Sequence, residues 1–213
     1  MVTQIRSHRS TPEWILRAIT KHKYFNPALR GLVFLLSLVP FALICYRVAL
    51  QDLGPDPAKV LMHETGDWML RFLVLVLLAT PLRRYGWGHL SRFRRMLGLF
   101  LFFYATLHLL VFAQVYVGWS GQVLLEELSE RPYVLVGFVA WLVLLPLAIT
   151  STQAWQRRLK RRWKTLHQWV YLVPPLAVLH IYWLARSDYG IVLLYGLVFA
   201  LLLGWRLQKK LSK

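Results

Sequence analysis

The chain has 213 residues, 57% of them hydrophobic, and its formal net charge at pH 7 is +17. A mean hydropathy of +0.46 is typical of a membrane protein. The positive charges stand in short runs between long apolar segments, which argues against a nucleic-acid-binding surface. The one cysteine, Cys45, excludes an internal disulfide, a CxxCH haem attachment and a cysteine-ligated iron–sulfur cluster. Any cofactor must therefore be held by histidine or without covalent attachment.

Six apolar segments are long enough to cross a bilayer as helices, at about 1.5 Å per residue. Their approximate bounds are 28–50, 56–82, 96–117, 132–149, 166–184 and 189–207. Asp56 and Pro57 open the second segment as an N-cap followed by proline at the first helical position. The first apolar run follows basic residues and is too long for a cleaved signal, so we expect an uncleaved signal-anchor.

Charge separates the connecting segments into two sets. The N-terminal segment, the 83–95 and 157–164 loops and the C-terminal tail hold nearly all the Lys and Arg. Every acidic residue except Glu13 lies in 51–67, 118–131 or 185–188. Because cytoplasmic loops carry an excess of Lys and Arg, both termini are predicted to be cytoplasmic. The sequence thus predicts an all-α, six-helix membrane bundle (28–207) between a basic cytoplasmic N-terminal segment (1–27) and a cytoplasmic tail (208–213).

Two histidines lie inside apolar spans. His108 is in the third span and His180 in the fifth, which runs in the same direction, and both stand at comparable depth. Two imidazoles at one depth on neighbouring helices could supply both axial ligands to a b-type haem, with Tyr104 and Phe112 packing on the ring. The alternative is that each histidine is hydrogen-bonded to a neighbouring helix. No Asp or Glu lies deep in a span, which weakens a proton-coupled transporter hypothesis.

Other polar residues are weaker candidates for a functional role. His167 stands 13 residues before His180, about 20 Å along a helix, near the cytoplasmic boundary. Pro174 and Pro175 lie between the two and can re-phase one half of the helix against the other. His63, near the outer end of the second span, could bind a metal or a quinol or simply face water. Arg47 and Arg71 are expected to reach toward headgroups, with pairing to haem propionates as the alternative.

Several motifs then occur in a recognisable order. They are TPLRRYG at 80–86, RRMLGL at 94–99, ATLHL at 105–109, RPY at 131–133, TSTQAWQRRLKRRWKTLHQWVYLV at 150–173 and LHIYW at 179–183. From about Asn26 to the sixth span, the chain resembles the MsrQ (YedZ) family of haem-bearing membrane subunits. This family serves the bacterial MsrPQ methionine sulfoxide reductase system and belongs to the ferric-reductase-like transmembrane superfamily.

The resemblance implies one or two b-type haems, with iron ligands matching His108, His167 and His180, and a flavin mononucleotide (FMN). It also implies a periplasmic molybdopterin partner of the MsrP type, and electrons from the quinone pool or a cytosolic flavin reductase. The wider superfamily often has an inner histidine about 13 residues before the outer one on the third span. Arg94 and Arg95 stand there instead, so the haem number and the ligand opposite His167 stay open.

We therefore expect an electron-transfer subunit of the bacterial inner membrane, with no catalytic residue of its own. Methionine sulfoxide reduction, for the repair of oxidised periplasmic proteins, would occur on the partner. No flavin domain follows the sixth span, so a separate donor is expected. Two alternatives remain: a b-type cytochrome serving another acceptor, such as a metal-ion reductase, or a transporter with structural histidines.

Overall fold

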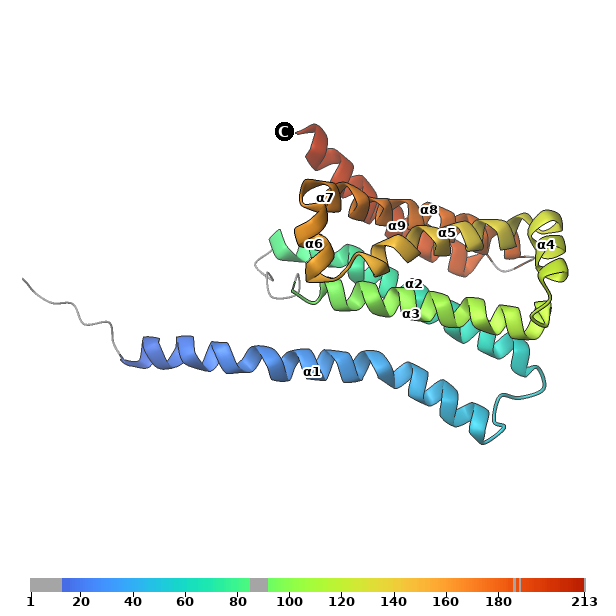
Figure 1. Ribbon diagram of the computed structural model, residues 1–213, viewed down its shortest axis with the longest axis horizontal. Coiled ribbons are helices and arrows are strands. Elements are labelled where there is room, and N and C mark those ends of the chain that lie inside the picture. The colour runs from blue at the N-terminus through green and yellow to red at the C-terminus, as the bar shows by residue number, and fades with distance from the viewer. Residues whose placement is uncertain (1–12, 85–91, 186, 188, 213) are drawn as a thin grey trace, which may run out of the picture. The chain divides into compact units, whose positions relative to one another are not determined.

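The computed structural model describes residues 13–84, 92–185, 187 and 189–212 (Figure 1). The predicted cap of the last span, Asp188, lies outside these residues. The described chain is helical between short connections and contains no strand, which confirms the all-α prediction. Its elements are α1 (Glu13–Ala49), α2 (Pro57–Arg84), α3 (Arg94–Phe112), the π-helical turn η2 (Ala113–Val117), α4 (Gly121–Glu130), α5 (Pro132–Ile149), α6 (Gln153–Leu159), α7 (Arg161–His167), the 3₁₀ segment η3 (Gln168–Leu172), α8 (Val173–Leu184) and α9 (Gly190–Leu211).

The chain divides into two compact units, Met1–Val39 and Pro40–Lys213. The first unit contains most of α1, where the Ser37 hydroxyl donates to the Val33 carbonyl oxygen at 2.7 Å. This bond satisfies a hydroxyl within an apolar helix. The second unit contains the helices from α2 to α9 and all the candidate site residues.

Five described helices are long and apolar enough to cross a membrane. They cover Pro27–Ala49, Pro57–Leu82, Arg94–Val117, Pro132–Ile149 and Gly190–Lys209. The predicted span 166–184 is not among them, because it is divided between the end of α7, η3 and α8. The chain is thus a multi-pass membrane protein, but six uninterrupted spans are not confirmed, and the cytoplasmic position of both termini stays a prediction.

The break in the predicted fifth span has a cause in the sequence. Pro174 and Pro175 lack the N–H groups that would bond to the carbonyls of Val170 and Tyr171, and their rings crowd those carbonyls. The preceding residues, Gln168–Leu172, form the tighter 3₁₀ helix instead of an α-helix. The predicted change of helical phase between the two halves of this span therefore corresponds to the 3₁₀ segment Gln168–Leu172.

Within the second unit, α2 packs along α3, and α5 packs against α8. The most deeply buried side chains, Leu73, Leu77, Leu101, Tyr104 and Val173, come from α2, α3 and α8. Phe72 stacks on Tyr104 and Phe100, with ring centroids 5.1 and 5.7 Å apart. By contrast, α9 exposes large apolar side chains, which suits a helix in contact with lipid: Leu193, Leu194, Leu197 and Leu201.

The two ends of this bundle differ in character. Figure 1 shows α4 at one end of the bundle and α6 and α7 at the other. The α4 end includes the predicted N-cap of α2, where the Asp56 Oδ1 atom accepts the Lys59 backbone N–H at 3.0 Å. The connection and helices at the opposite end carry the basic run 157–164. The separation of charge seen in the sequence is therefore a separation between the two ends of the folded bundle.

Candidate functional site

The structure brings together two of the predicted site histidines. The rings of His108, on α3, and His180, on α8, have centroids 6.3 Å apart and planes at 82° to one another. The two residues are 72 positions apart in the sequence, so only the packing of the helices makes them neighbours. The predicted proximity of these imidazoles thus agrees with the packing of α3 and α8, while their equal depth in a membrane stays a prediction.

The backbone of α5 fixes the ring of His180. Its Nδ1 atom lies 2.6 Å from the carbonyl oxygen of Tyr133. A carbonyl only accepts, so Nδ1 carries the proton and donates, which leaves the lone pair on Nε2. Gly137 stands one helical turn beyond Tyr133, and a Cβ atom there would lie 2.8 Å from Nδ1 and 2.9 Å from Cε1 of the ring. A glycine is therefore required for the imidazole to reach the carbonyl.

A hydroxyl on α2 fixes the ring of His108 in the same tautomer. The Thr65 hydroxyl donates its one proton to the Leu61 carbonyl oxygen at 2.7 Å. Its oxygen lies 3.1 Å from Nδ1 of His108 and so accepts a hydrogen bond from it. A Cβ atom at Gly66 would lie 3.3 Å from Cε1 of this ring. Both imidazoles thus keep Nε2 as an open lone pair, backed by an anchored Nδ1–H, as metal-binding histidines do.

Both rings line a cavity of about 670 Å³ between the helices. Its deeper wall is apolar and includes Ala105, Leu109, Phe112, Ala140, Trp141, Leu144, Val173 and Ala177. Its mouth, toward α4, is polar and includes Asp56, Lys59, His63, Arg131 and Tyr133. A hydrogen bond to the Tyr133 hydroxyl, with Glu127 and Glu130 nearby, raises the pKa of the Arg131 guanidinium, which also pairs with Glu127 at 3.2 Å. The cavity suits a largely apolar body with anionic edges.

The two imidazole nitrogens of His108 and His180 suit an iron ion whose other ligands come from a macrocycle. Metal–imidazole bonds are about 2.0 Å long, so two imidazoles that bind one metal ion must be close neighbours. The 6.3 Å between the ring centroids of His108 and His180 is compatible with one metal ion bound by both. No group of three or more His, Cys, Asp or Glu side chains in the described residues could bind a bare metal ion. Two imidazoles suffice where the remaining ligands belong to a planar cofactor.

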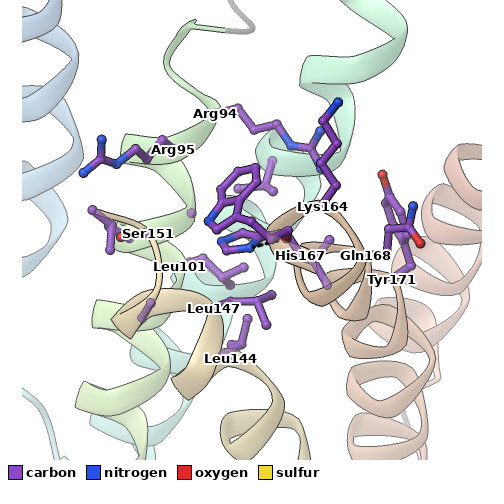
Figure 2. A pocket seen from close by; sticks show the side chains of 16 residues that line it. Arg94, Arg95, Leu101, Leu144, Leu147, Ser151, Lys164, His167, Gln168 and Tyr171 are labelled. Carbon is purple, nitrogen blue, oxygen red and sulfur yellow. Dashed lines mark hydrogen bonds between the residues drawn. The ribbon is translucent and has the colours of Figure 1, made fainter. Parts of the chain in front are cut away.

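His167 lies in a different cavity, at the α7 end of the bundle. Its Nδ1 atom is 3.1 Å from the Trp163 carbonyl oxygen, and its ring stacks on the Trp163 indole with centroids 3.9 Å apart. The backbone of Leu147 is a second hydrogen-bonding neighbour of this ring. Figure 2 shows His167 between leucine side chains on one side and Arg94 and Lys164 on the other. Among the described residues that line this cavity there is no second histidine.

The other predicted candidates are placed as follows. His63 is exposed and lines the mouth of the outer cavity, and Phe112 lines its apolar wall. Tyr104 does not line this cavity; its hydroxyl accepts the Phe41 backbone N–H at 3.1 Å. Arg47 pairs with Glu64, and Arg71 pairs with Asp67 at 3.4 Å while lying over the Trp68 ring. Neither arginine lines the cavity, so the structure gives no support to their pairing with a cofactor there.

Four residues that position the histidines were not predicted from the sequence: Thr65, Gly66, Tyr133 and Gly137. The sequence could have indicated Gly66 and Gly137, because a glycine in the middle of an apolar span often marks a close approach of another group. The carbonyl of Tyr133 has no signal of its own, since every residue carries one. Its role depends on the packing of α5 against α8.

Comparison with known proteins gives a family match and a set of relatives. Residues 65–178, which include all four positioning residues and His108, match the family model described as "Ferric reductase like transmembrane component". The protein-methionine-sulfoxide reductase heme-binding subunit MsrQ of Xanthomonas oryzae pv. oryzae (strain MAFF 311018) is 48% identical over 190 residues, 86% of this chain and 87% of that protein.

Two further relatives carry the same name. The one from Xanthomonas campestris pv. campestris (strain B100) is 52% identical over 161 residues, 75% of this chain and 74% of its own. The one from Polaromonas naphthalenivorans (strain CJ2) is 41% identical over 192 residues, 88% of each chain. No solved structure matches the chain. Identity at this level over most of both lengths, together with the family match over residues 65–178, shows that the chain belongs to the MsrQ family of ferric-reductase-like transmembrane proteins.

Proposed function

We propose that this chain is a haem b-binding electron-transfer subunit of the bacterial inner membrane. The observation that carries the proposal is the neighbouring pair of imidazoles, whose ring centroids are 6.3 Å apart and whose Nδ1 atoms are each held by the protein. The names of the relatives, which include "heme-binding subunit", support it. When bound, haem would supply a one-electron carrier within the membrane.

Different residues of the chain would contact different parts of the cofactor. His108 and His180 would be the axial ligands, oriented by Thr65 and by the Tyr133 carbonyl. The apolar wall of the cavity would exclude water and keep the local dielectric constant low. Lys59 and Arg131 at the mouth are placed to neutralise anionic edges such as propionates. The exposed His63, at the same mouth, remains an additional candidate.

His167 stays a predicted ligand of a second haem. Its Nδ1 atom is anchored like those of the outer pair, which supports the prediction. No second imidazole lines its cavity among the described residues, which weighs against a second bis-histidine site. We therefore propose one haem at the outer pair, and a haem-to-protein ratio of one or two decides whether a second is bound. FMN is proposed as a further cofactor, on the cationic side of the bundle.

The donor and acceptor follow from the charge of the two ends. We propose that electrons enter at the basic end, from the quinone pool or a cytosolic flavin reductase. They would leave at the α4 end, where Glu126, Glu127 and Glu130 lie, to a periplasmic molybdopterin enzyme of the MsrP type. Leu144 lines both the outer and the inner cavity, so the two cavities adjoin at this side chain. Reduction of methionine sulfoxide would then occur on the partner.

An optical experiment tests the haem proposal. The full chain, purified in detergent from haem-replete cells, is expected to show a b-type Soret band that shifts on reduction with dithionite. His108→Ala and His180→Ala should each largely abolish this band, and His63→Ala tests whether the exposed histidine at the mouth contributes to it. Size-exclusion elution at the wild-type volume verifies folding. A folded, colourless wild-type protein would rule the proposal out.

A second experiment tests the acceptor. The reduced protein is mixed with an oxidised MsrP-type enzyme or with a ferric chelate, and reoxidation is followed at the Soret band. Faster reoxidation by the molybdoenzyme, with methionine sulfoxide consumed, supports the proposed partner. Faster reoxidation by the chelate would make the chain a metal-ion reductase, which the family match alone does not exclude.

A further inference from the structure

The helix α4 forms part of the wall of the outer cavity, the one that His108 and His180 line. Figure 1 shows this helix lying across one end of the bundle. Two of its apolar side chains, Leu124 and Leu128, stand one helical turn apart and line the cavity. Leu125 does not line the cavity and is 69% exposed. The helix therefore turns one face toward the cavity and another toward the outside of the bundle.

α4 is attached to the bundle mainly through the elements that adjoin it in the sequence. It packs against η2, which precedes it, and against α5, which follows it, and none of its own residues is buried. Its first turn is capped locally, because the Ser120 hydroxyl accepts the Val123 backbone N–H at 3.4 Å. A helix that supplies its own cap and is held mainly at its two ends can move as one unit, since few buried contacts have to break.

The connection before α4 has the backbone geometry of a hinge. Gly118 and Trp119 both have positive φ angles, of 59° and 60°. Glycine adopts this conformation freely, whereas a bulky residue such as tryptophan is strained in it. The five residues before this pair form the π-helical turn η2, a feature that often occurs at functional sites. A rotation of α4 about this connection would release the strain at Trp119.

At the other end of α4, Arg131 connects the helix to α5. The guanidinium pairs with Glu127 of α4 at 3.2 Å and donates to the Tyr133 hydroxyl of α5 at 3.4 Å. Pro132 opens α5 and keeps Arg131 in an extended conformation, so α4 and α5 do not merge into one helix. Arg131 also lines the mouth of the cavity. An ion pair at this mouth therefore helps to hold α4 in its observed position.

We propose that α4 is a lid over the outer cavity, hinged at Gly118 and Trp119 and held closed by Arg131. The open lid admits the ligand of this cavity from the α4 end of the bundle. The closed lid places Leu124 and Leu128 against the apolar body of the ligand. A guanidinium has five N–H donors, so Arg131 can bind an anionic edge of the ligand while it pairs with Glu127, and closure and binding favour one another. The inference rests on the proposed function for the identity of the ligand, but the movement of the lid does not depend on haem.

A distance measurement tests the movement itself. In a Cys45→Ser background, spin labels are attached at Gln122→Cys on α4 and at Leu193→Cys on α9, two exposed positions. Their separation is measured by pulsed electron paramagnetic resonance on the full chain in nanodiscs, prepared from haem-depleted and from haem-replete cells. Two populations are expected, with the longer distance reduced severalfold in the haem-replete protein.

A variant of the hinge should shift these populations. Gly118→Ala places a Cβ atom on a residue with positive φ, which destabilises the closed lid, so the open population should rise about tenfold. Gly54→Ala is the matched control, because Gly54 also has a positive φ and its added Cβ would likewise meet nothing within 4 Å, but it lies between α1 and α2. The control should leave the populations unchanged.

A second measurement tests the contact between the lid and the ligand. Transfer of haem from the purified protein to excess apomyoglobin is followed at the Soret band. Leu124→Ala and Leu128→Ala shorten the side chains that face the cavity, and Glu127→Gln removes the ion pair with Arg131. Each is expected to speed haem loss about fivefold. Leu125→Ala, in the same helix but outside the cavity, is the matched control and should lose haem at the wild-type rate.

Two results would overturn the inference. One is a single label distance that is the same in the wild type, Gly118→Ala and Gly54→Ala, because α4 would then be a fixed wall. The other is equal haem loss from Leu124→Ala and Leu125→Ala, which would mean that the ligand leaves without passing α4. A folded wild type that lacks a Soret band would refute the haem proposal alone. The populations in Gly118→Ala and Gly54→Ala would still decide whether α4 is a lid.

Discussion

Gly137 controls how closely α8 can approach α5. In an α-helix, the side chain at one position partly covers the carbonyl one turn earlier, here that of Tyr133. With only hydrogen at 137, the Nδ1–H group of His180 reaches this carbonyl at 2.6 Å while its oxygen remains in the helix. Gly66 stands in the corresponding place beside His108, but with more room, because its added Cβ would lie 3.3 Å from the ring rather than 2.8 Å.

This difference gives a graded prediction for two alanine variants. Gly137→Ala should displace the ring of His180, since the added Cβ atom would lie 2.8 Å from a ring atom that is held by the Tyr133 carbonyl, and should lower haem content severalfold. Gly66→Ala should lose much less haem than Gly137→Ala. The measurement is the pyridine haemochrome content of each purified variant per mole of protein. Gly98→Ala, where a Cβ would meet nothing within 4 Å, is the control. Equal haem content in Gly137→Ala and Gly98→Ala would contradict this account of the site.

Thr65 affects the electronic character of His108. Its oxygen accepts the Nδ1–H bond of the imidazole, which makes the opposite nitrogen a stronger donor to a metal. Thr65→Val keeps the shape and removes the acceptor, so the oxidised iron should be less stabilised and the haem midpoint potential should rise. Thr65→Ser should restore the wild-type value. A redox titration followed at the Soret band measures both; an unchanged potential in Thr65→Val would show that the hydroxyl has only a packing role.

The contrast between these residues shows what the sequence could predict about the site. His108 and His180 could be paired because an ionisable residue in an apolar span is rare and its depth follows from helix rise. Thr65 and Tyr133 could not be assigned, because their roles exist only once α2 and α5 pack beside α3 and α8. The predicted role of Tyr104 on the cofactor ring has no support, because that side chain is enclosed by Phe72 and the backbone of Phe41.

At the scale of elements, hydropathy and length predicted the spans well where a helix is continuous. The segment 166–184 has the required apolar length, but length alone does not reveal that Gln168–Leu172 is wound as 3₁₀. Converting five residues from α to 3₁₀ adds about 20° and about 0.5 Å per residue. The change amounts to roughly 100° of rotation and 2.5 Å of length between His167 and His180. The prolines therefore help set the direction in which His180 points.

A double variant tests this relation. Replacing Pro174 and Pro175 by alanine restores the missing N–H groups and allows a continuous α-helix through η3. The lower half should then rotate relative to the upper, so His180 and His167 can no longer occupy their present sites together. We expect loss of most of the outer haem, while total helicity by circular dichroism stays equal or rises. Pro146→Ala, in α5, is the control for proline removal itself. Full haem retention in the double variant would show that packing alone fixes the direction of His180.

At the scale of the whole molecule, the two ends of the bundle differ in charge, and the proposed electron route assigns a different role to each end. The proposed route requires the α7 end to face the cytoplasm and the α4 end to face the periplasm. The sequence supports this orientation, since the basic residues lie in alternate connections and short basic loops are retained in the cytoplasm. The folded bundle adds that the imidazole pair opens toward the α4 end and the cationic cavity lies at the α7 end.

Cysteine labelling tests the orientation without changing any charge. In a Cys45→Ser background, Gln122→Cys on α4 and Gln153→Cys on α6 each present one exposed thiol. In intact spheroplasts, a membrane-impermeant maleimide should label position 122 at once and position 153 only after permeabilisation. Both glutamines stand at helix starts near connections, so their reactivities in detergent should be comparable and serve as the control. The reverse pattern would place the acidic end in the cytoplasm. A periplasmic enzyme could then not dock beside the imidazole pair, and electrons would have to leave by the cationic cavity instead.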